Sequence, residues 1–296
     1  MPSEHSGIGA FRCLTRWPAC DSALVPVVVH LSDIHFGAHR PDLAQSLLAD
    51  IASVGPDLVV ISGDLTQRAR RGQFEQARAF IDRLPAAALT VVGNHDLPLV
   101  NLPRRFLSET RRYERYITQD LDPIAVLPGL VAVGLDTMPA WRWKAGHVSP
   151  RQAAIVRGAL GSAPPGAWRL LVTHHPVLPA ELSGLVGRDL LIGACAEADV
   201  AILLSGHMHL PSADVVDLDA PGVHRRALAL VTGTAISSRT RGTANAYEVI
   251  QLDGAMTAGG RITVRIREPT ATGWWNSRTV HFGLTSDGVV ADGGPS

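Results

Sequence analysis

The sequence predicts an α/β fold, and two kinds of apolar pattern support this prediction. Residues 27–29, 58–61 and 201–204 are apolar without alternation, as in strands that helices cover on both faces of a parallel or mixed sheet. Segments with helical spacing lie between several of these runs. Late in the chain, strands follow one another with little helix between them. This order predicts a βαβ-like first part and an antiparallel second sheet or sheet edge.

The helices are predicted from apolar spacing and from end signals. The clearest start is at Ser149, which can cap a helix, with Pro150 at the first helical position and Gln152 able to close a capping box. Gly161 can then end this helix. The predicted helices are residues 41–54, 73–84, 104–117 and 149–160. The predicted strands are residues 27–31, 58–61, 89–92, 130–135, 170–172, 200–204, 227–231, 247–252, 261–266 and 278–282.

The composition is that of an ordinary globular chain. Its 296 residues are 46% hydrophobic and 18% charged, which is enough for a sizeable core. We expect one domain over residues 22–284, an N-terminal extension over 1–21 and a flexible tail over 285–296. Three cysteines do not indicate a disulfide scaffold, and reduced thiols are favoured over a pair between Cys13 and Cys20.

The charge balance limits the partners of the chain. Lys+Arg and Asp+Glu both number 27, so no net field attracts nucleic acid or an anionic membrane. We therefore expect no long nucleic-acid partner. The first 24 residues lack the apolar region of a signal peptide. No stretch approaches the ~18 apolar residues of a transmembrane helix, and a cytoplasmic location is expected.

Five polar clusters follow predicted strands, and they contain the types of side chain that bind divalent metals. Carboxylates, imidazoles and an amide oxygen are such ligands, and they are costly to bury unpaired. Each cluster alone also fits a polar turn, but five at five strand ends favour one shared metal centre. The clusters are Asp33-Ile34-His35, Gly63-Asp64, Gly93-Asn94-His95-Asp96, His174-His175-Pro176 and Gly206-His207-Met208-His209.

The spacing within the clusters suggests how they bind. Asp33 and His35 are two residues apart, which in a strand places both side chains on one side, and the two histidines of the last cluster repeat this spacing. The two oxygens of Asp64 can bridge two ions. Either His174 or His175 can end its strand as a ligand, and the side chain of His175 is expected to point to the other face.

The third cluster predicts acid–base chemistry beside the metals. Asn94 offers a neutral oxygen to an ion. His95 can protonate a leaving group, and Asp96 can orient the imidazole and raise its pKa.

The series of five clusters resembles the calcineurin-like metallophosphoesterases over about residues 27–210, with every motif present and in order. The resemblance implies a four-layer α/β sandwich with two central mixed sheets flanked by helices and a metal site at the carboxyl ends of strands. The motif spacing and the helix at 149–160 are similar to the class III cyclic-nucleotide phosphodiesterase and glycerophosphodiesterase subgroup.

The resemblance also implies the ligands and the mechanism. Two ions of iron, manganese or zinc are expected, and a hydroxide that bridges them would attack phosphorus while His95, supported by Asp96, protonates the leaving oxygen. One ion would be held by Asp33, His35, Asp64 and His209, and the other by Asp64, Asn94, His174 and His207.

The substrate is less well defined by the sequence. A small phosphodiester such as 3′,5′-cyclic AMP is the first expectation, with a phosphomonoesterase, protein phosphatase or nucleotide-sugar pyrophosphatase as the alternative. A nuclease or a non-catalytic scaffold is disfavoured. Arg239 and Arg241 can hold a phosphate or form a solvated loop. The segment with Trp141, Trp143 and Lys144 can stack a base or cap the core, and residues 274–275 (Trp-Trp) are a candidate homodimer or membrane-surface contact.

Overall fold

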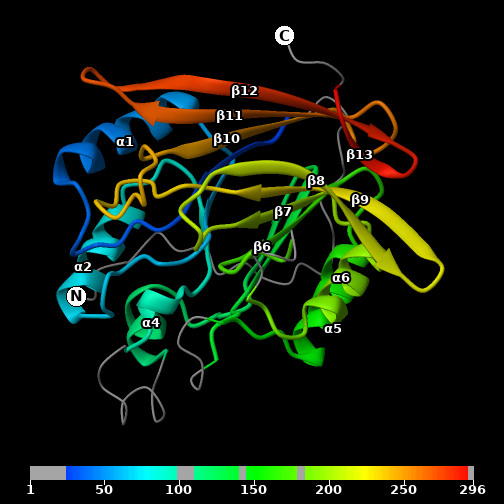
Figure 1. Cartoon of the computed structure of the whole chain (residues 1–296), viewed down its shortest axis with the longest axis horizontal. Coiled ribbons are helices and arrows are strands. Elements are labelled where there is room, and N and C mark those ends of the chain that lie inside the picture. Colours follow the sequence, from blue (N-terminus) through cyan, green and yellow to red (C-terminus); the bar gives the residue numbers. More distant parts are fainter. Residues whose placement is uncertain (1–24, 99–109, 140–144, 179–183, 293–296) are drawn as a thin grey trace, which may run out of the picture.

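The structure is a computed structural model, and it describes residues 25–98, 110–139, 145–178 and 184–292. It confirms the α/β class, because helices flank a large mixed sheet that runs through the molecule (Figure 1). Within these ranges, ladder hydrogen bonds connect 13 strands into one sheet with two halves. The predictions for Cys13, Cys20, Trp141, Trp143 and Lys144 lie outside the described residues.

The first half of the sheet carries the three strands that begin the described chain. β1, β2 and β3 are parallel neighbours. β10 pairs antiparallel with β1, and β11, β12 and β13 continue the sheet as antiparallel neighbours. In sheet order these strands are β3 (Ala88–Thr90), β2 (Leu58–Ile61), β1 (Val27–Leu31), β10 (Tyr247–Asp253), β11 (Arg261–Pro269), β12 (Trp274–Thr285) and β13 (Gly288–Ala291).

The second half repeats the parallel arrangement. β5, β6, β7 and β9 are parallel neighbours, while β4 and β8 pair antiparallel with β5 and β9. Neither β4 nor β8 was predicted from the sequence. In sheet order the strands are β8 (Ser212–Ala220), β9 (Val223–Val231), β7 (Ile202–Ser205), β6 (Trp168–Thr173), β5 (Leu130–Leu135) and β4 (Ile124–Leu127).

The two halves meet at β13. Gly288 of β13 pairs with Arg226 of β9, and this pair links the halves in the described ladder. The prediction of two sheets did not include this link. The prediction of a flexible tail is wrong for the start of that segment, since residues 288–291 pair with β12 and Val289 is buried in the core.

Among the described residues, three hydrophobic cores lie between successive layers of the fold. The central core contains side chains from both halves, such as Val60 of β2 and Leu170 of β6, so the halves pack face to face. An outer core lies between the first half and helices α1, α2 and α4, and another lies between the second half and helices α5 and α6. Because successive strand residues point to opposite faces, Val28 enters the central core and Val29 the outer one. This burial on two faces explains the unbroken apolar runs.

The helices largely follow the predicted segments. The capping box at α5 is confirmed, since the Ser149 hydroxyl accepts the backbone N–H of Gln152 at 3.3 Å. α6 was not predicted, and the part of the predicted helix 104–117 that is described is α4. Every described helix is too short or too polar to cross a bilayer. The helices are α1 (Pro41–Val54), α2 (Arg71–Ile81), α4 (Arg111–Tyr116), α5 (Pro150–Gly161) and α6 (Arg188–Glu197), with a 3-10 turn η1 (Asn94–Asp96).

Trp274 corrects one expectation about surfaces. Its side chain is buried and stacks edge-on against Tyr247, with ring centroids 5.3 Å apart. Its indole N–H donates to the hydroxyl of Ser46 at 3.2 Å. Trp274 is therefore a core residue rather than part of a contact surface, whereas 53% of Trp275 is exposed.

Candidate metal centre

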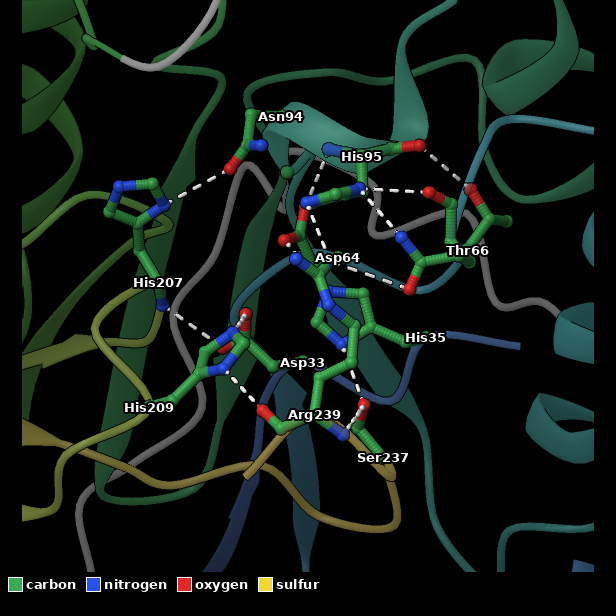
Figure 2. A network of polar contacts seen from close by, with 12 residues as sticks. Asp33, His35, Asp64, Thr66, Asn94, His95, His207, His209, Ser237 and Arg239 are labelled. Carbon is green, nitrogen blue, oxygen red and sulfur yellow. Dashed lines mark hydrogen bonds and ion pairs between the residues drawn. The ribbon is translucent and has the colours of Figure 1, made fainter. Parts of the chain in front are cut away.

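The predicted ligands come together where the carboxyl ends of parallel strands from both halves meet. The first three clusters follow β1, β2 and β3, and the last two follow β6 and β7. Figure 2 shows side chains from the loops after β1, β2, β3 and β7 converging on one region, together with the loop that follows β9. The ligand side chains brought together are Asp33, His35, Asp64, Asn94, His174, His207 and His209.

The backbone at this site adopts an unusual conformation. Five predicted ligands have positive φ, a region that Asp and His tolerate better than most residues but still at a cost. Our expectation from strand alternation was therefore right about convergence and wrong about its cause. After β1, β2 and β7 the ligand residues are left-handed, so they do not follow the alternation of a strand. The five residues and their φ angles are Asp33 (51°), His35 (53°), Asp64 (53°), His207 (68°) and His209 (59°).

Two motif glycines allow the close approach of the ligands. A Cβ at Gly206 would lie 1.8 Å from the hydroxyl oxygen of Ser32 and 2.6 Å from Oδ2 of Asp33. A Cβ at Gly93 would lie 2.2 Å from Oδ1 of Asp64 and 2.1 Å from its backbone nitrogen. Any side chain at these positions would displace a predicted ligand, so the glycines supply space for the site.

The first group of ligands lies between Asp33 and His209. Nε2 of His209 is 2.9 Å from Oδ1 of Asp33. Nδ1 of His209 donates to the backbone carbonyl of Arg239 at 2.8 Å, which leaves a lone pair on Nε2 of the neutral ring. Two lone pairs facing each other require a cation between them, either a proton or a metal ion. A ligand histidine that donates its other N–H to a backbone carbonyl is the usual arrangement at metal sites.

Asp64 lies between the first group and a second one. Its Oδ2 is 3.2 Å from Nε2 of His35, and its Oδ1 is 3.6 Å from Nε2 of His174. Nδ1 of His35 is in turn 3.2 Å from the hydroxyl of Ser237. One carboxylate therefore presents one oxygen to each of two imidazoles that belong to different predicted ion sites.

Three acceptor atoms form the second group. Oδ1 of Asn94 is 3.1 Å from Nε2 of His174 and 3.0 Å from Nδ1 of His207, and the two nitrogens are 3.2 Å apart. The His175 alternative is disfavoured, because Nδ1 of His175 lies 2.8 Å from the hydroxyl of Thr137. His174 is therefore the histidine of its cluster that joins the site.

The carboxylate and imidazole atoms of the site are close enough together to bind metal ions. Ligand atoms of Asp33, His35 and His209 lie within 4.8 Å of one another, as do those of Asp33, Asp64 and His174. A third such group combines His35 and Asp64 with His95. Two buried carboxylates repel each other unless cations compensate them, and the site supplies imidazoles on both sides.

The pKa shifts show that the carboxylates are held ionised. Burial raises the pKa of Asp33, but the hydrogen bond with His209 and the nearby imidazoles outweigh it and bring the pKa to about 2. Burial opposes ionisation of Asp64 too, yet His174 and His35 hold its pKa well below the usual value. Burial and the neighbouring His174 lower the pKa of His207 to about 4. Anionic carboxylates and a neutral His207 are the forms that bind metals.

His95 lies at the rim of the site, and its orientation has a different cause from the one predicted. Nδ1 of His95 donates to the backbone carbonyl of Gln67 at 2.8 Å, so Nε2 is the atom that faces outward. A guanidinium nitrogen of Arg239 lies 3.1 Å from this Nε2. The backbone N–H of His95 donates to Oδ1 of Asp64 at 2.8 Å.

Asp96 holds the loop rather than the imidazole. Its Oδ1 accepts the backbone N–H of Thr66 at 2.8 Å, and its Oδ2 accepts that of Gly93 at 3.1 Å. Its hydrogen bonds within the described residues go to these backbone groups, to Leu65 N–H and to the Thr66 hydroxyl. Burial, with a contribution from Asp64, raises the pKa of Asp96 to about 7. The predicted support of the His95 ring by Asp96 is therefore corrected to support by Gln67.

The hydrogen bonds between the site histidines and their partners were not predicted from the sequence, although Arg239 was predicted there as a possible phosphate contact. Ser62, Gln67 and Ser237 each contact a site histidine, and Arg239 contacts two. The position of the loop after β9 follows from the direction of that strand. β9 is parallel to β7, so its carboxyl end must lie at the same edge of the sheet.

Comparison with known proteins identifies the family. The sequence model of the calcineurin-like phosphoesterases matches residues 26–211, a range that contains all five polar clusters. The chain belongs to the calcineurin-like phosphoesterase family. This confirms the resemblance drawn from the clusters, and metal-dependent phosphoric ester hydrolases are the enzyme class of this family.

Two curated relatives and one solved structure illustrate the similarity. The chain is 27% identical over 203 residues to a probable cyclic nucleotide phosphodiesterase of Rhodococcus erythropolis, covering 62% of this chain and 64% of that protein. The match thus spans less than two thirds of that relative. A probable cyclic nucleotide phosphodiesterase of Synechococcus sp. is 24% identical over 204 residues, covering 63% and 74%. A purple acid phosphatase from yellow lupin (Lupinus luteus) seeds has a TM-score of 0.62 at 13% identity, covering 90% and 55%, which shows likeness of fold.

Proposed function

We propose that this chain is a phosphodiesterase that uses two metal ions and acts on small phosphodiesters, with 3′,5′-cyclic AMP as the first candidate. The observation that carries the proposal is the position of Asp64. Its two oxygens face His35 on one side and His174 on the other. A carboxylate placed in this way can serve as the ligand that bridges two metal ions.

The ligands follow the two groups of side chains. The first ion would be held by Asp33, His35, Asp64 and His209, and the second by Asp64, Asn94, His174 and His207. Oxygen and imidazole ligands of this kind suit manganese, iron or zinc. When bound, such a pair supplies an activated hydroxide as the nucleophile and neutralises charge on the phosphoryl oxygens.

The chain itself supplies the proton for the leaving group. The Gln67 carbonyl holds the Nδ1 hydrogen of His95, so Nε2 is the atom that would take up a second proton and then pass it to the departing ester oxygen. His95 is half-buried, whereas the ligands around it are mostly buried. The ring therefore reaches solvent and substrate without being part of either ligand group.

The names of the relatives support a diester substrate. Both curated relatives are described as probable cyclic nucleotide phosphodiesterases. The balanced charge of the chain disfavours a long nucleic acid, since such substrates are bound through many phosphate contacts. A cytoplasmic location belongs to the same proposal, as does a single catalytic domain that extends from the predicted start at residue 22 through β13.

A substrate panel on metal-reconstituted protein tests the proposal. It comprises cyclic nucleotides, glycerophosphodiesters, nucleotide sugars and matched chromogenic mono- and diesters, with Asp64→Ala as the blank. We expect the highest kcat/KM for a small diester. Preference for monoesters would instead establish a phosphomonoesterase, and equal activity on every substrate would contradict a dedicated phosphodiesterase.

A further inference from the structure

The loop after β9 is attached to the metal centre at two points. The hydroxyl of Ser237 lies 3.2 Å from Nδ1 of His35, and the backbone carbonyl of Arg239 accepts the Nδ1 hydrogen of His209 at 2.8 Å. The backbone N–H of Arg239 donates to the same Ser237 hydroxyl at 3.1 Å. Two predicted ligands of the first ion therefore fix the backbone of this loop, as Figure 2 shows.

This attachment places the Arg239 side chain beside His95, at the exposed edge of the site. Arg239 is exposed, and its guanidinium contacts Nε2 of His95 at 3.1 Å and Oε1 of Gln67 at 3.4 Å. Neither of these two partner atoms carries a negative charge. Within the described residues no carboxylate forms an ion pair with Arg239, in contrast to Arg267, which pairs with Asp50 at 2.6 Å.

Arg241 adds a second positive charge at the same edge. Its guanidinium donates to the backbone carbonyl of Met208 at 3.3 Å, between His207 and His209. Arg241 is also exposed and has no carboxylate partner among the described side chains. Two cations without counter-charges therefore border a site whose ligands lie deeper.

We propose that Arg239 binds a non-esterified phosphoryl oxygen of the substrate and so positions phosphorus at the metal centre. A guanidinium offers a planar fork of donors that matches phosphate oxygens. An anion would replace the neutral ring of His95 as the partner of Arg239, because a charge-assisted hydrogen bond is the stronger one. His95 Nε2 then becomes free to face the leaving oxygen.

This inference deepens the proposed function, on which it rests, by assigning the residue that recognises the phosphoryl group. The alternative for this segment is a solvated arginine loop. The loop backbone, and not the guanidinium, supports the ligand His209, so the guanidinium is available to bind an anion.

The test compares Arg239→Gln and Arg239→Lys with the native chain, each reconstituted with manganese. Metal content is measured by mass spectrometry, orthophosphate binding by calorimetry, and kcat and KM on a chromogenic diester. We expect Arg239→Gln to keep both metals, because only the side chain changes. Its phosphate affinity and kcat/KM should each fall by roughly 10- to 100-fold. Arg239→Lys should recover part of both losses.

Arg71→Gln is the matched control, since Arg71 lies on α2 in an exposed pair with Glu75, outside the site. It should match the native chain in every measurement. Intact metal content with less than about a twofold change in phosphate affinity for Arg239→Gln would overturn the proposal. Loss of metal from that variant would also overturn it, by showing that the side chain supports the ligands.

The two proposals can fail separately. If the native chain hydrolyses no diester but binds phosphate in an Arg239-dependent way, the phosphodiesterase assignment is wrong and the phosphate site stands. If the native chain is an active diesterase and Arg239→Gln equals it in phosphate affinity and KM, only the inference about Arg239 is wrong.

Discussion

The imidazole of His174 donates from Nδ1 to the backbone carbonyl of Ser62 at 2.8 Å, across the interface between the two halves of the sheet. Ser62 follows β2 in the first half, and His174 follows β6 in the second. This bond fixes the tautomer, so that Nε2 of His174 presents a lone pair to Asn94 and Asp64. A predicted ligand in the second half is therefore oriented by the loop that carries Asp64 in the first half.

A buried pair beneath Ser62 gives the first prediction. Nε2 of His30 lies 2.9 Å from the Ser62 hydroxyl, and its Nδ1 lies 2.8 Å from Glu248, with all three residues buried. Glu248→Ala should lower the free energy of unfolding by about 3 kcal/mol, because it leaves His30 buried without its partner. Urea denaturation measures this. The double variant His30→Leu with Glu248→Leu should recover most of the loss, and a double variant as unstable as the single one would contradict the explanation.

The second prediction concerns metal content. Asp64→Ala should lose both ions, because both ligand groups share this carboxylate, and activity should fall by more than the roughly 10–100-fold typical of a residue that only supports a ligand. Metal analysis and thermal unfolding with and without manganese check this. At a free manganese concentration of 100 Kd, the free energy of unfolding of the native chain should rise by about 2.7 kcal/mol, and that of the variant should not change.

Asp189→Asn is the control for that experiment, since the Asp189 side chain is 89% exposed and lies on α6. It should bind metal as the native chain does. If Asp64→Ala retained one ion with full affinity, the bridging role of Asp64 would be wrong.

The third prediction separates chemistry from metal binding. His95→Ala should keep both metals and slow turnover by roughly 10²–10⁴-fold. The loss should be largest for diesters with poor leaving groups, because these depend most on protonation of the departing oxygen. Rates for a series of aryl esters measure this trend. Equal losses for good and poor leaving groups, or loss of metal, would exclude His95 as the proton donor.

The fourth prediction tests the space around Asp33. Gly206→Ala would place a methyl group 2.6 Å from Oδ2 of Asp33, so metal affinity and thermal stability should both fall. Gly158→Ala is the matched control, because Gly158 lies within α5 with no neighbouring atom within 4 Å of its added Cβ. The free energy of unfolding of that variant should rise by up to about 1 kcal/mol, because alanine has a higher helix propensity than glycine. Unchanged metal binding in Gly206→Ala would show that the loop relaxes freely.

The sequence was sufficient to predict the α/β class and to select polar clusters whose side chains lie close together in the structure. β1 and β2 have the predicted bounds, since residues buried on both faces leave an unbroken apolar run. β8 was missed because its two faces differ little in burial, and β13 because it is short and follows a polar turn. A strand of this kind is defined by its neighbours, which local sequence does not reveal.

Contacts between distant segments set the remaining features of the site. The bond of Asp96 to Thr66 joins loops 30 residues apart, and that of His35 to Ser237 spans 202 residues. No spacing rule predicts which hydroxyl or carbonyl will meet a ring nitrogen. The left-handed turns of the ligand residues were likewise hidden, because Asp and His adopt that conformation in response to their surroundings rather than by strong preference.

The predicted ligands of each proposed ion come from both halves of the sheet, and the side chains of the central core set how closely those halves approach. A residue such as Val60 or Leu170 therefore acts as a spacer for the metal centre although it contacts no ligand. Changing the volume of such a spacer would alter the separation of the two ligand groups from the interior of the protein.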